Sequence, residues 1–265
     1  PDTAHKLFGE RLYMSPSKFD NFSRCRFMYF CRNGLKAESL QPAQFNVMQR
    51  GTMVHFVLEH IIEEFGKDVS KLTSEEISDN VERLADMYLD GISGYRSVET
   101  PRSRYLVTTV TRSLKYVVER LALEFAQSDF TPVKCELKIG ADGDMPEIKV
   151  PLDNGCTLSL TGIVDRVDKY NGYVRIVDYK TGSREFKLPD ILFGQNMQML
   201  LYLMSIWRNG TGFYENIVPS GVLYFPARMN TYNASREDTP EQDRDRSFAS
   251  GKMNGMLVGD DEIIG

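Results

Sequence analysis

The hydrophobic and polar positions of the first half of the chain repeat with the period of an amphipathic helix. Apolar residues recur there at three- and four-residue spacing, which places them on one stripe of a helix. Ser15 or Ser17 can cap a first helix, and Thr73, followed by Ser-Glu-Glu, opens another with a capping signal. The helices that this pattern predicts cover residues 15–30, 54–65, 73–90 and 103–127.

The period changes near Pro132, where alternation by two replaces the helical spacing and β-branched residues become frequent. An apolar helix is expected over residues 192–208, and a poorly ordered charged loop around residues 232–252. The strands expected from the alternation cover residues 133–139, 148–152, 157–170, 173–180 and 220–225. Helices that enclose a mixed sheet follow from this pattern, which is an α/β or α+β arrangement.

The segment from Gly162 to Lys180 has the most informative pattern. Asn171-Gly172 lies between two alternating stretches and is the strongest short signal for a β-hairpin with a type I′ turn. If this is the turn, Tyr170 pairs with Tyr173 and the numbers of opposed residues sum to 343. Asp165 then lies opposite Asp178, and Ile163 opposite Lys180. On the other face Asp168 lies opposite Arg175, which we interpret as ordinary cross-strand charge pairing.

This register brings Asp165, Asp178 and Lys180 to one face of the hairpin. Two opposed carboxylates repel each other, and a divalent cation between them removes the conflict. Oxygen ligands suit Mg²⁺ or Mn²⁺, and a lysine beside the ion can orient water and stabilise charge on a phosphate. The alternative is a solvated strand face with a cross-strand Asp–Lys pair, and a one-residue slip of register would separate the side chains.

Four further residues are candidates for the same site. Glu136, on the strand expected over residues 133–139, is either a further acid near the metal or an edge-strand charge. His55 is either a metal ligand or a helix histidine hydrogen-bonded to a neighbour. Gln198 and Tyr202 are four residues apart and share a helix face, so they contact a phosphate, position a loop near one, or form a polar stripe at a helix–sheet boundary.

Composition restricts the class of protein. The 265 residues are 42% hydrophobic, and no run of about 18 apolar residues suggests a membrane span. The net charge is −5, although residues 1–36 hold seven basic residues against three acidic ones. This disfavours a protein that binds DNA through a basic surface alone.

The four cysteines are expected to be reduced thiols in a cytoplasmic protein. The chain begins without methionine or a signal peptide, so we expect a piece of something longer.

The candidate residues occur in an order that resembles a known family. Asp165, then Asp178-Tyr179-Lys180, then Gln198 and Tyr202 resemble the RecB-like branch of PD-(D/E)XK nucleases. Within that branch, the chain resembles the C-terminal nuclease domain of the AddB family of helicase–nuclease subunits. The resemblance covers roughly residues 12–225. Its other motifs are Ser-Pro-Ser-Lys-Phe at 15–19 with Cys-Arg-Phe-Met-Tyr-Phe at 25–30, Gly-Thr-Met-Val-His at 51–55, and Gly-Ile-Val-Asp-Arg-Val-Asp at 162–168.

The resemblance implies a fold and a division of the chain. It implies an α/β, restriction-endonuclease-like core, in which helices flank a mixed central β-sheet, with a helical N-terminal half. Residues 1–130 would form the helical part of the nuclease domain, residues 131–226 the catalytic core, and residues 227–265 a charged, partly flexible segment.

The resemblance also implies roles for single residues. His55, Asp165 and Asp178 would hold the catalytic Mg²⁺ or Mn²⁺, with help from the Tyr179 carbonyl. Lys180 would be the catalytic lysine. Gln198 and Tyr202 would form the helix motif near the scissile phosphate. Glu136 would be a further acid, assigned less firmly.

The implied function is metal-dependent exonucleolytic hydrolysis of DNA inside a bacterial helicase–nuclease for double-strand break repair and recombination. The implied partners are linear DNA ends, whose single strand a motor feeds to the site, and a helicase or nuclease subunit, with no membrane. The alternative is a non-catalytic DNA-binding or scaffold module on the same fold, which typically lacks one of Asp165, Asp178 and Lys180.

The family's cysteines are a departure. One N-terminal and three C-terminal cysteines hold an iron–sulfur cluster in the family. Cys25 matches the first of these positions, but no cysteine follows Cys156. We therefore expect no iron–sulfur cluster in this chain.

Overall fold

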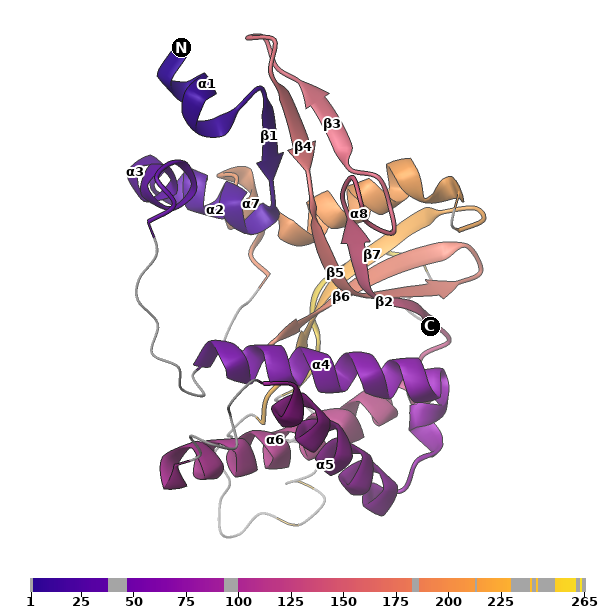
Figure 1. Cartoon of the computed structure of the whole chain (residues 1–265). Helices are drawn as coiled ribbons and strands as arrows, with labels where there is room; N and C mark the ends of the chain where they lie inside the picture. Colours follow the sequence, from indigo (N-terminus) through magenta and orange to yellow (C-terminus); the bar gives the residue numbers. More distant parts are fainter. Residues whose placement is uncertain are drawn as a thin grey trace.

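Two β-sheets and the helices around them make up the described part of the chain, as the computed structural model in Figure 1 shows. The structure describes residues 2–37, 47–92, 100–182, 186–212, 214–229 and 251–260, together with the single residues 239, 242 and 263. The helical elements are α1 (Asp2–Phe8), α2 (Pro16–Arg24), α3 (Arg26–Tyr29), η1 (Phe30–Gly34), α4 (Val47–Phe65), η2 (Gly66–Lys71), α5 (Ser74–Gly91), α6 (Pro101–Gln127), α7 (Leu188–Leu192), α8 (Gln198–Asn209) and η3 (Gly210–Gly212). The strands are β1 (Arg11–Met14), β2 (Thr131–Ile139), β3 (Ile148–Pro151), β4 (Thr157–Leu160), β5 (Gly162–Tyr170), β6 (Tyr173–Lys180), β7 (Val218–Pro226) and β8 (Asn254–Leu257).

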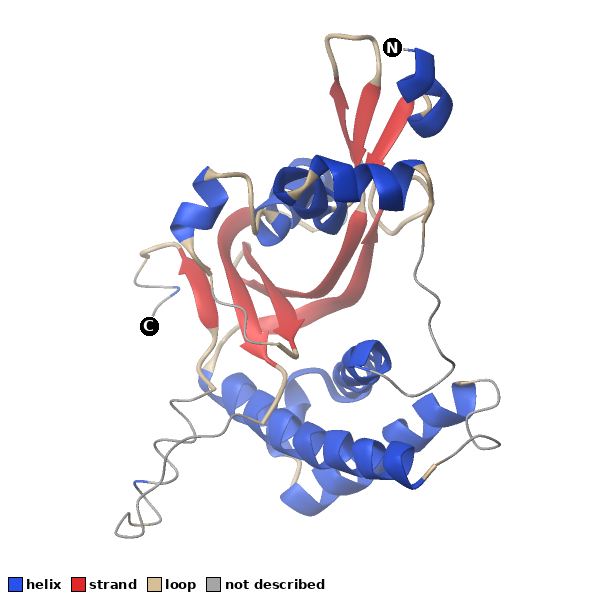
Figure 2. Ribbon diagram, turned by 90° about the vertical axis from the view of Figure 1, so that its left-hand side faces the viewer, coloured by secondary structure: helices blue, strands red, loops and turns tan. Residues whose placement is uncertain are grey.

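The larger sheet is mixed. Its five strands have the order β2-β5-β6-β7-β8, in which β6 and β7 are parallel and the other neighbours are antiparallel. Helices cover it on both sides, with α4, α5 and α6 below and α8 above in the orientation of Figure 1 (Figures 1 and 2). The predicted fold class, a mixed central sheet flanked by helices with a helical N-terminal half, is therefore confirmed.

Each face of this sheet has its own hydrophobic core. The α6-side core lies between the sheet and α4, α5 and α6, and the α8-side core lies between the sheet and α8. The α6-side core includes Leu58, Leu84, Leu121, Cys135, Val177, Tyr179 and Phe225. The α8-side core includes Leu137, Val164, Val167, Ile176, Met199 and Ile206. Because the sheet is buried on both faces, β6 and β7 are apolar at most positions rather than at every second one.

Local sequence signals explain where several helices begin and end. Thr73 forms the predicted capping box with Glu76, and α5 follows it directly. The helix predicted from residue 15 to residue 30 is divided at Cys25, whose extended backbone separates α2 from α3. The helix predicted over residues 192–208 begins later than expected. Gly194 and Asn196 have positive φ angles of 72° and 55°, which end α7 and delay the start of α8.

The predicted β-hairpin is present. Asn171 and Gly172 have φ angles of 45° and 85°, as a type I′ turn requires, and Tyr170 pairs with Tyr173. The predicted register holds from this turn as far as Arg166 opposite Val177.

Beyond that pair, the predicted pairing of Asp165 with Asp178 and of Ile163 with Lys180 is wrong. The first half of β5 continues its ladder with β2, whereas the end of β6 continues with β7. The two strands of the hairpin therefore separate at the position where the candidate site lies.

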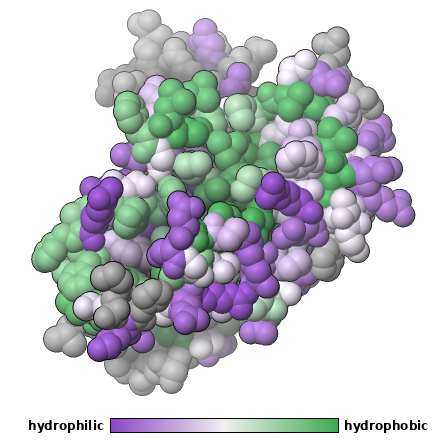
Figure 3. Space-filling view, turned by 90° about the horizontal axis from the view of Figure 1, so that it is seen from above, coloured by the Kyte–Doolittle hydropathy of each residue, from purple (hydrophilic) through white to green (hydrophobic). Residues whose placement is uncertain are grey.

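A second sheet has three strands in the order β1-β4-β3. The sequence did not predict β1, which pairs in parallel with β4 although more than half of the chain separates the two strands. This sheet projects from the upper part of the molecule in Figure 1, and Figure 3 shows apolar side chains gathered beside hydrophilic ones on this upper face. The loop predicted around residues 232–252 lies almost wholly outside the described residues. None of the described helices has the length and apolar character needed to cross a membrane.

Candidate active site

Three side chains from three elements meet at the edge of the α6-side core. His55 lies on α4, Glu136 on β2 and Asp165 on β5. The His55 Nδ1 atom is 3.5 Å from Oδ2 of Asp165 and 3.8 Å from Oε1 of Glu136. One ligand atom of each residue lies within 4.8 Å of the others, and each side chain is partly exposed. A cation from solvent can therefore reach a nitrogen and two carboxylates together.

Both strands change face at the two carboxylates. Cys135 packs in the α6-side core, but Leu137, two residues on, packs in the α8-side core. Residues two apart on a regular strand share a face, so the backbone must turn between them. Glu136 has a φ angle of 46°, a left-handed conformation that is uncommon outside glycine. Such conformations gather at functional sites, where the surrounding structure maintains them.

β5 has the matching change of face at Asp165. Val164 packs in the α8-side core, whereas the guanidinium of Arg166 lies over the ring of Phe125 on α6. The pairs Cys135–Arg166 and Leu137–Val164 flank Glu136 and Asp165, so the two turns lie side by side. This paired irregularity, rather than regular alternation, aims both carboxylates toward His55.

The backbone holds the Asp165 carboxylate in place. The Tyr179 N–H donates a hydrogen bond of 2.7 Å to Oδ2 of Asp165, where a regular ladder would offer a carbonyl. Burial and the nearby carboxylate of Asp178 raise the pKa of Asp165 to about 7, against the lowering effects of His55 and of the Tyr179 hydrogen bond. The site thus carries negative charge that the protein alone compensates only in part.

The pKa of the His55 imidazole is also raised, although burial acts on it in the opposite direction. Burial lowers its pKa, but the nearby carboxylates of Glu136, Asp165 and Asp178 together raise it by more. The net effect is a pKa above the ordinary value for histidine. A proton on His55 therefore occupies the position that a cation would take among these acids.

Asp178 and Lys180 form a separate ion pair beside this group. Lys180 Nζ contacts Oδ2 of Asp178, and it also lies 5.3 Å from the centre of the Tyr224 ring. Both side chains are largely buried, and they project from β6 at alternate positions of the same face. Sequence reasoning placed Asp178 among the metal ligands. In the described part of the chain, the three-residue group instead contains Glu136, while Asp178 lies near enough to shift the pKa of Asp165.

Gln198 and Tyr202 lie on α8 and contact the start of β5. The Tyr202 hydroxyl is hydrogen-bonded to the side chain of Gln198 and to the backbone of Ile163, and burial raises its pKa to about 12. A Cβ atom added at Gly162 would lie 2.4 Å from the Tyr202 hydroxyl, so only glycine allows the ring to approach this closely. Of the three interpretations that the sequence left open, this buried geometry favours positioning: Tyr202 locates β5.

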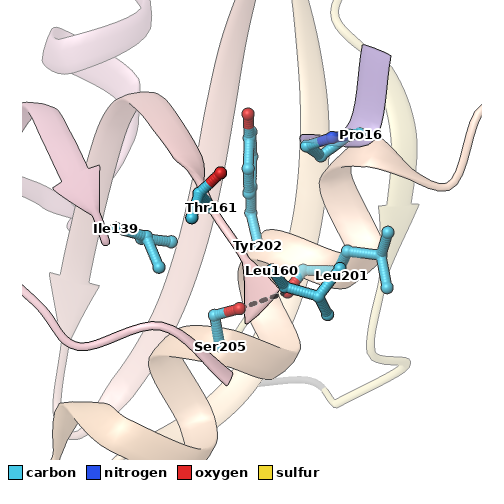
Figure 4. A pocket seen from close by; sticks show the side chains of 7 residues that line it. All are labelled: Pro16, Ile139, Leu160, Thr161, Leu201, Tyr202 and Ser205. Carbon is cyan, nitrogen blue, oxygen red and sulfur yellow. Dashed lines mark hydrogen bonds between the residues drawn. The ribbon is translucent and has the colours of Figure 1, made fainter. Parts of the chain in front are cut away.

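A small cavity lies beside this contact. Its volume is about 10 Å³, close to that of one water-sized probe. Figure 4 shows the Tyr202 ring standing between Thr161 and Pro16, so this residue of α8 lies between the start of α2 and the residue that links β4 to β5. The segment of chain that precedes Asp165 is therefore held by Tyr202 of α8, and Asp165 itself is held by the Tyr179 N–H.

Sequence reasoning missed a buried ion network behind the site. The predicted pairing of Asp168 with Arg175 is present, but the interpretation as ordinary cross-strand pairing is wrong, since Asp168 is fully buried. Arg166 and Glu124 complete the network, which links β5 and β6 to α6. The Asp-Arg-Val-Asp segment held a signal, because an arginine between two acids on an apolar strand needs buried partners.

Cys25, the residue that matches the family's first cluster ligand, lies away from these groups. It is exposed on the surface and caps α3, with its Sγ accepting a hydrogen bond of 3.4 Å from the Met28 N–H.

The donor set fits a hard divalent cation. The carboxylates are ligands of the kind that Mg²⁺ or Mn²⁺ takes, the imidazole nitrogen adds a donor that first-row transition ions accept more readily than Mg²⁺ does, and the group contains no thiol of the kind that softer ions prefer. Burial first, and repulsion from the Asp178 carboxylate second, raise the pKa of Asp165. A bound dication would remove this repulsion and release the proton.

Comparisons with known proteins identify the family of the chain and several of its relatives. The sequence profile of the PD-(D/E)XK nuclease superfamily matches residues 13–258. The chain is 31% identical to an ATP-dependent helicase/deoxyribonuclease subunit of Clostridium acetobutylicum, over 99% of this chain and 24% of that protein. It is 32% identical to the protein of the same name from Clostridium kluyveri, over 98% and 23% of the two chains. The chain thus spans about a quarter of the length of these relatives.

Proposed function

The chain belongs to the PD-(D/E)XK nuclease superfamily, and we propose that it is the metal-dependent deoxyribonuclease domain of a bacterial helicase–nuclease. Its relatives carry the name of such a subunit and are about four times as long, so the motor activity would reside elsewhere in the parent protein or in a partner. We further propose that the domain acts as an exonuclease on DNA ends in the cytoplasm.

One observation carries the proposal. His55, Glu136 and Asp165 converge at the point where β5 and β6 separate, and the Asp178–Lys180 pair lies directly beside them. A structural ion pair would need only one acid for one base. Here three acids gather around one histidine and one lysine, in an arrangement that raises the pKa of Asp165 and is relieved by a dication.

The proposed ligands of Mg²⁺ or Mn²⁺ are His55, Asp165 and Asp178, with the Tyr179 carbonyl and Glu136 as further donors. When bound, the cation supplies Lewis-acid polarisation of the phosphate and lowers the pKa of water. Tyr179 has two roles at the site, because its N–H holds the Asp165 carboxylate and its carbonyl belongs to the same segment of β6.

Lys180 is the proposed catalytic lysine. In hydrolysis, a water oxygen attacks phosphorus, the bond to the leaving oxygen breaks, and a proton moves from the attacking water to the products. The Lys180 ammonium can orient that water and neutralise charge on the phosphate as it increases. The ion pair with Asp178 and the contact with the Tyr224 ring hold Nζ at the edge of the site.

Gln198 and Tyr202 complete the site as positioning residues in this proposal. Tyr202 is buried and bonded to the backbone of Ile163, so its effect on the reaction passes through the strand that holds Asp165. Gln198, at the first turn of α8, fixes the Tyr202 hydroxyl and leaves its other polar atoms for the substrate.

The test is cleavage of end-labelled linear DNA by the purified domain with Mg²⁺, with Mn²⁺ and with EDTA. Asp165→Ala and Lys180→Ala serve as site variants, and Glu82→Ala, which removes an exposed surface ion pair with Lys115, serves as the matched control. We expect metal-dependent cleavage that both site variants lose and that the control retains.

The second candidate, a non-catalytic DNA-binding or scaffold module, predicts a different result. Such a module would bind DNA or Mn²⁺ without cutting under any metal condition. The intact set of Asp165, Asp178 and Lys180 favours the nuclease, because a binding module has no need of the lysine beside the acids. Absence of both cleavage and Asp165-dependent Mn²⁺ binding would rule out the proposed site.

A further inference from the structure

A fully buried arginine directly follows Asp165 in the chain. The Nε atom of Arg166 lies 2.8 Å from Oδ1 of Asp168, and its Nη2 atom lies 2.9 Å from Oε2 of Glu124. The guanidinium is 4.9 Å from the centre of the Phe125 ring. Its Nη1 atom donates a long hydrogen bond of 3.5 Å to the Tyr179 hydroxyl. Four partners on two strands and one helix therefore fix the guanidinium.

A second arginine closes the network. The Nε atom of Arg175 donates to Oδ2 of Asp168 at 3.0 Å, and its Nη2 atom donates to Oε1 of Glu124 at 2.5 Å. Two arginines thus share two carboxylates across β5, β6 and α6. Buried ion networks lose hydration, and apolar side chains of similar volume often give equal or greater stability. Stability alone is consequently a weak explanation for this network.

Its location suggests another explanation. Arg166 is the first residue of β5 beyond the change of face at Asp165, and it forms the last β5–β6 pair, with Val177. The next link between the strands is the hydrogen bond from Tyr179 N–H to the Asp165 carboxylate. Arg166 contacts the side chain of that same tyrosine, so one residue on β6 is held at both its ring and its backbone.

We propose that Arg166 is a positioning residue for the metal site. By binding Asp168, Glu124 and Tyr179 together, it holds the turned strand so that the Tyr179 N–H meets the Asp165 carboxylate. A guanidinium suits this task because its donors have fixed directions in one plane, which an apolar side chain or an ammonium lacks. The inference rests on the proposed function only in taking Asp165 as a metal ligand.

Two variants of the network test the proposal. Arg166→Met removes the guanidinium at similar length, and Glu124→Gln weakens its contact with α6 without touching either strand. The matched control is Glu147→Gln, which weakens the pair between the buried Glu147, just before β3, and the partly exposed Arg11 on β1. Two quantities are measured on the whole chain: hydrogen exchange of the Tyr179 amide by NMR in EDTA, and the affinity for Mn²⁺ by calorimetry.

We expect the Tyr179 amide to exchange roughly 10-fold faster, relative to the Val177 amide, in both network variants. We expect the Mn²⁺ affinity to fall about 10- to 100-fold in Arg166→Met, as when a residue behind a metal ligand is lost. Arg166→Lys should not restore either value. Glu147→Gln should lower the melting temperature while leaving both quantities unchanged.

The proposal is overturned if the network variants only lower the melting temperature, with Tyr179 exchange and Mn²⁺ affinity matching those of Glu147→Gln. If the wild-type chain binds no Mn²⁺, the proposed function fails, but the amide exchange still decides whether Arg166 positions Tyr179. If Arg166→Met does not fold, Glu124→Gln decides by the same two measurements.

Discussion

The carboxyl group of Asp165 is only partly ionised near neutral pH, because burial and Asp178 raise its pKa to about 7. In the unfolded chain its pKa returns to about 3.8. Between these values the folded state binds more protons than the unfolded state, so folding stability falls as the pH rises from about 4 to about 7. The metal-free site therefore destabilises the fold at the pH where it would work.

Asp165→Asn should stabilise the metal-free chain. The amide can still accept the Tyr179 hydrogen bond, but it removes the charge. We expect a gain in unfolding free energy of at least ~1 kcal/mol at pH 8 and a much smaller one near pH 4, where the acid is protonated in the folded state and only about half ionised in the unfolded state. Urea unfolding in EDTA at both pH values measures it. A gain of equal size at both would show that the charge of Asp165 is not the cause.

Glu136 combines a carboxylate with a backbone conformation that glycine prefers, and two substitutions separate these properties. Glu136→Gly removes the carboxylate and accepts the φ angle of 46°, whereas Glu136→Ala removes the carboxylate and keeps the strain. We expect the glycine variant to be more stable than the alanine variant by about 1 kcal/mol in EDTA.

Both Glu136 variants should weaken Mn²⁺ binding by the same factor, because both lack the same ligand. Urea unfolding gives the stability difference and calorimetry gives the affinities. An alanine variant as stable as the glycine variant would contradict the strain at Glu136. Unchanged affinity in both would remove Glu136 from the proposed metal site.

At the scale of the element, β5 is held on both sides of Asp165. On one side, Tyr202 packs on Gly162 and bonds the backbone of Ile163. On the other side, Arg166 is bound to α6 through Glu124. The strand changes face between these two anchors. The position of Asp165 therefore depends more on the contacts that hold β5 on both sides of it than on the hairpin register that the sequence predicted.

Gly162→Ala tests the first anchor. The added methyl group would lie 2.4 Å from the Tyr202 hydroxyl and 2.5 Å from Cε1, so the ring or the strand must move. We expect a loss of roughly 1–3 kcal/mol of stability, as for other overpacked sites, together with reduced Mn²⁺ affinity.

A double-mutant cycle identifies the cause of that loss. Tyr202→Ala removes the ring, so Gly162→Ala should cost much less in that background. Chemical unfolding of the four proteins gives the coupling energy. Additive losses would mean that the Gly162 substitution acts through the backbone rather than through Tyr202.

The sequence predicted those elements whose determinants are local. The Asn171-Gly172 turn fixes its own geometry, and Thr73 caps its own helix, so both were predictable from a few adjacent residues. The change of face at Asp165 was not predictable in this way. It is accompanied by the contact of Arg166 with Glu124, 42 residues earlier than Arg166, and by the positive φ angle of Glu136, a residue type that rarely adopts it.

Similar reasoning applies to the candidate site. Asp165, Asp178 and Lys180 were proposed together from the register of the hairpin, but the paired residues end at Arg166 and Val177, so the reason given for the grouping is wrong. Asp178 nevertheless lies near enough to raise the pKa of Asp165. Glu136 and His55 remained open alternatives, since only tertiary packing brings α4 and β2 to the hairpin. Parallel pairing of β1 with β4 had no local signal at all, because its strands are far apart in sequence.

At the scale of the whole molecule, charge separates this chain from proteins that bind DNA through a basic surface. The net charge is −5, and the acids of the site add local repulsion of phosphate. A divalent cation would reverse the sign of that local field. Metal binding and DNA binding should therefore be strongly coupled in the isolated chain.

The last prediction follows from this coupling. A fluorescent single-stranded oligonucleotide should bind at least ~10-fold more tightly in Ca²⁺ than in EDTA, because a dication at the site replaces repulsion by attraction. Ca²⁺ occupies oxygen-rich sites, so it can take the place of Mg²⁺ or Mn²⁺ in a measurement of binding alone. Fluorescence anisotropy measures both affinities at one ionic strength, so that screening is constant. Asp165→Asn should bind slightly better than wild type in EDTA and lose most of the Ca²⁺ effect. Tight binding in EDTA that Ca²⁺ leaves unchanged would mean that DNA is held by a basic surface remote from these acids, and the coupling argument would be wrong.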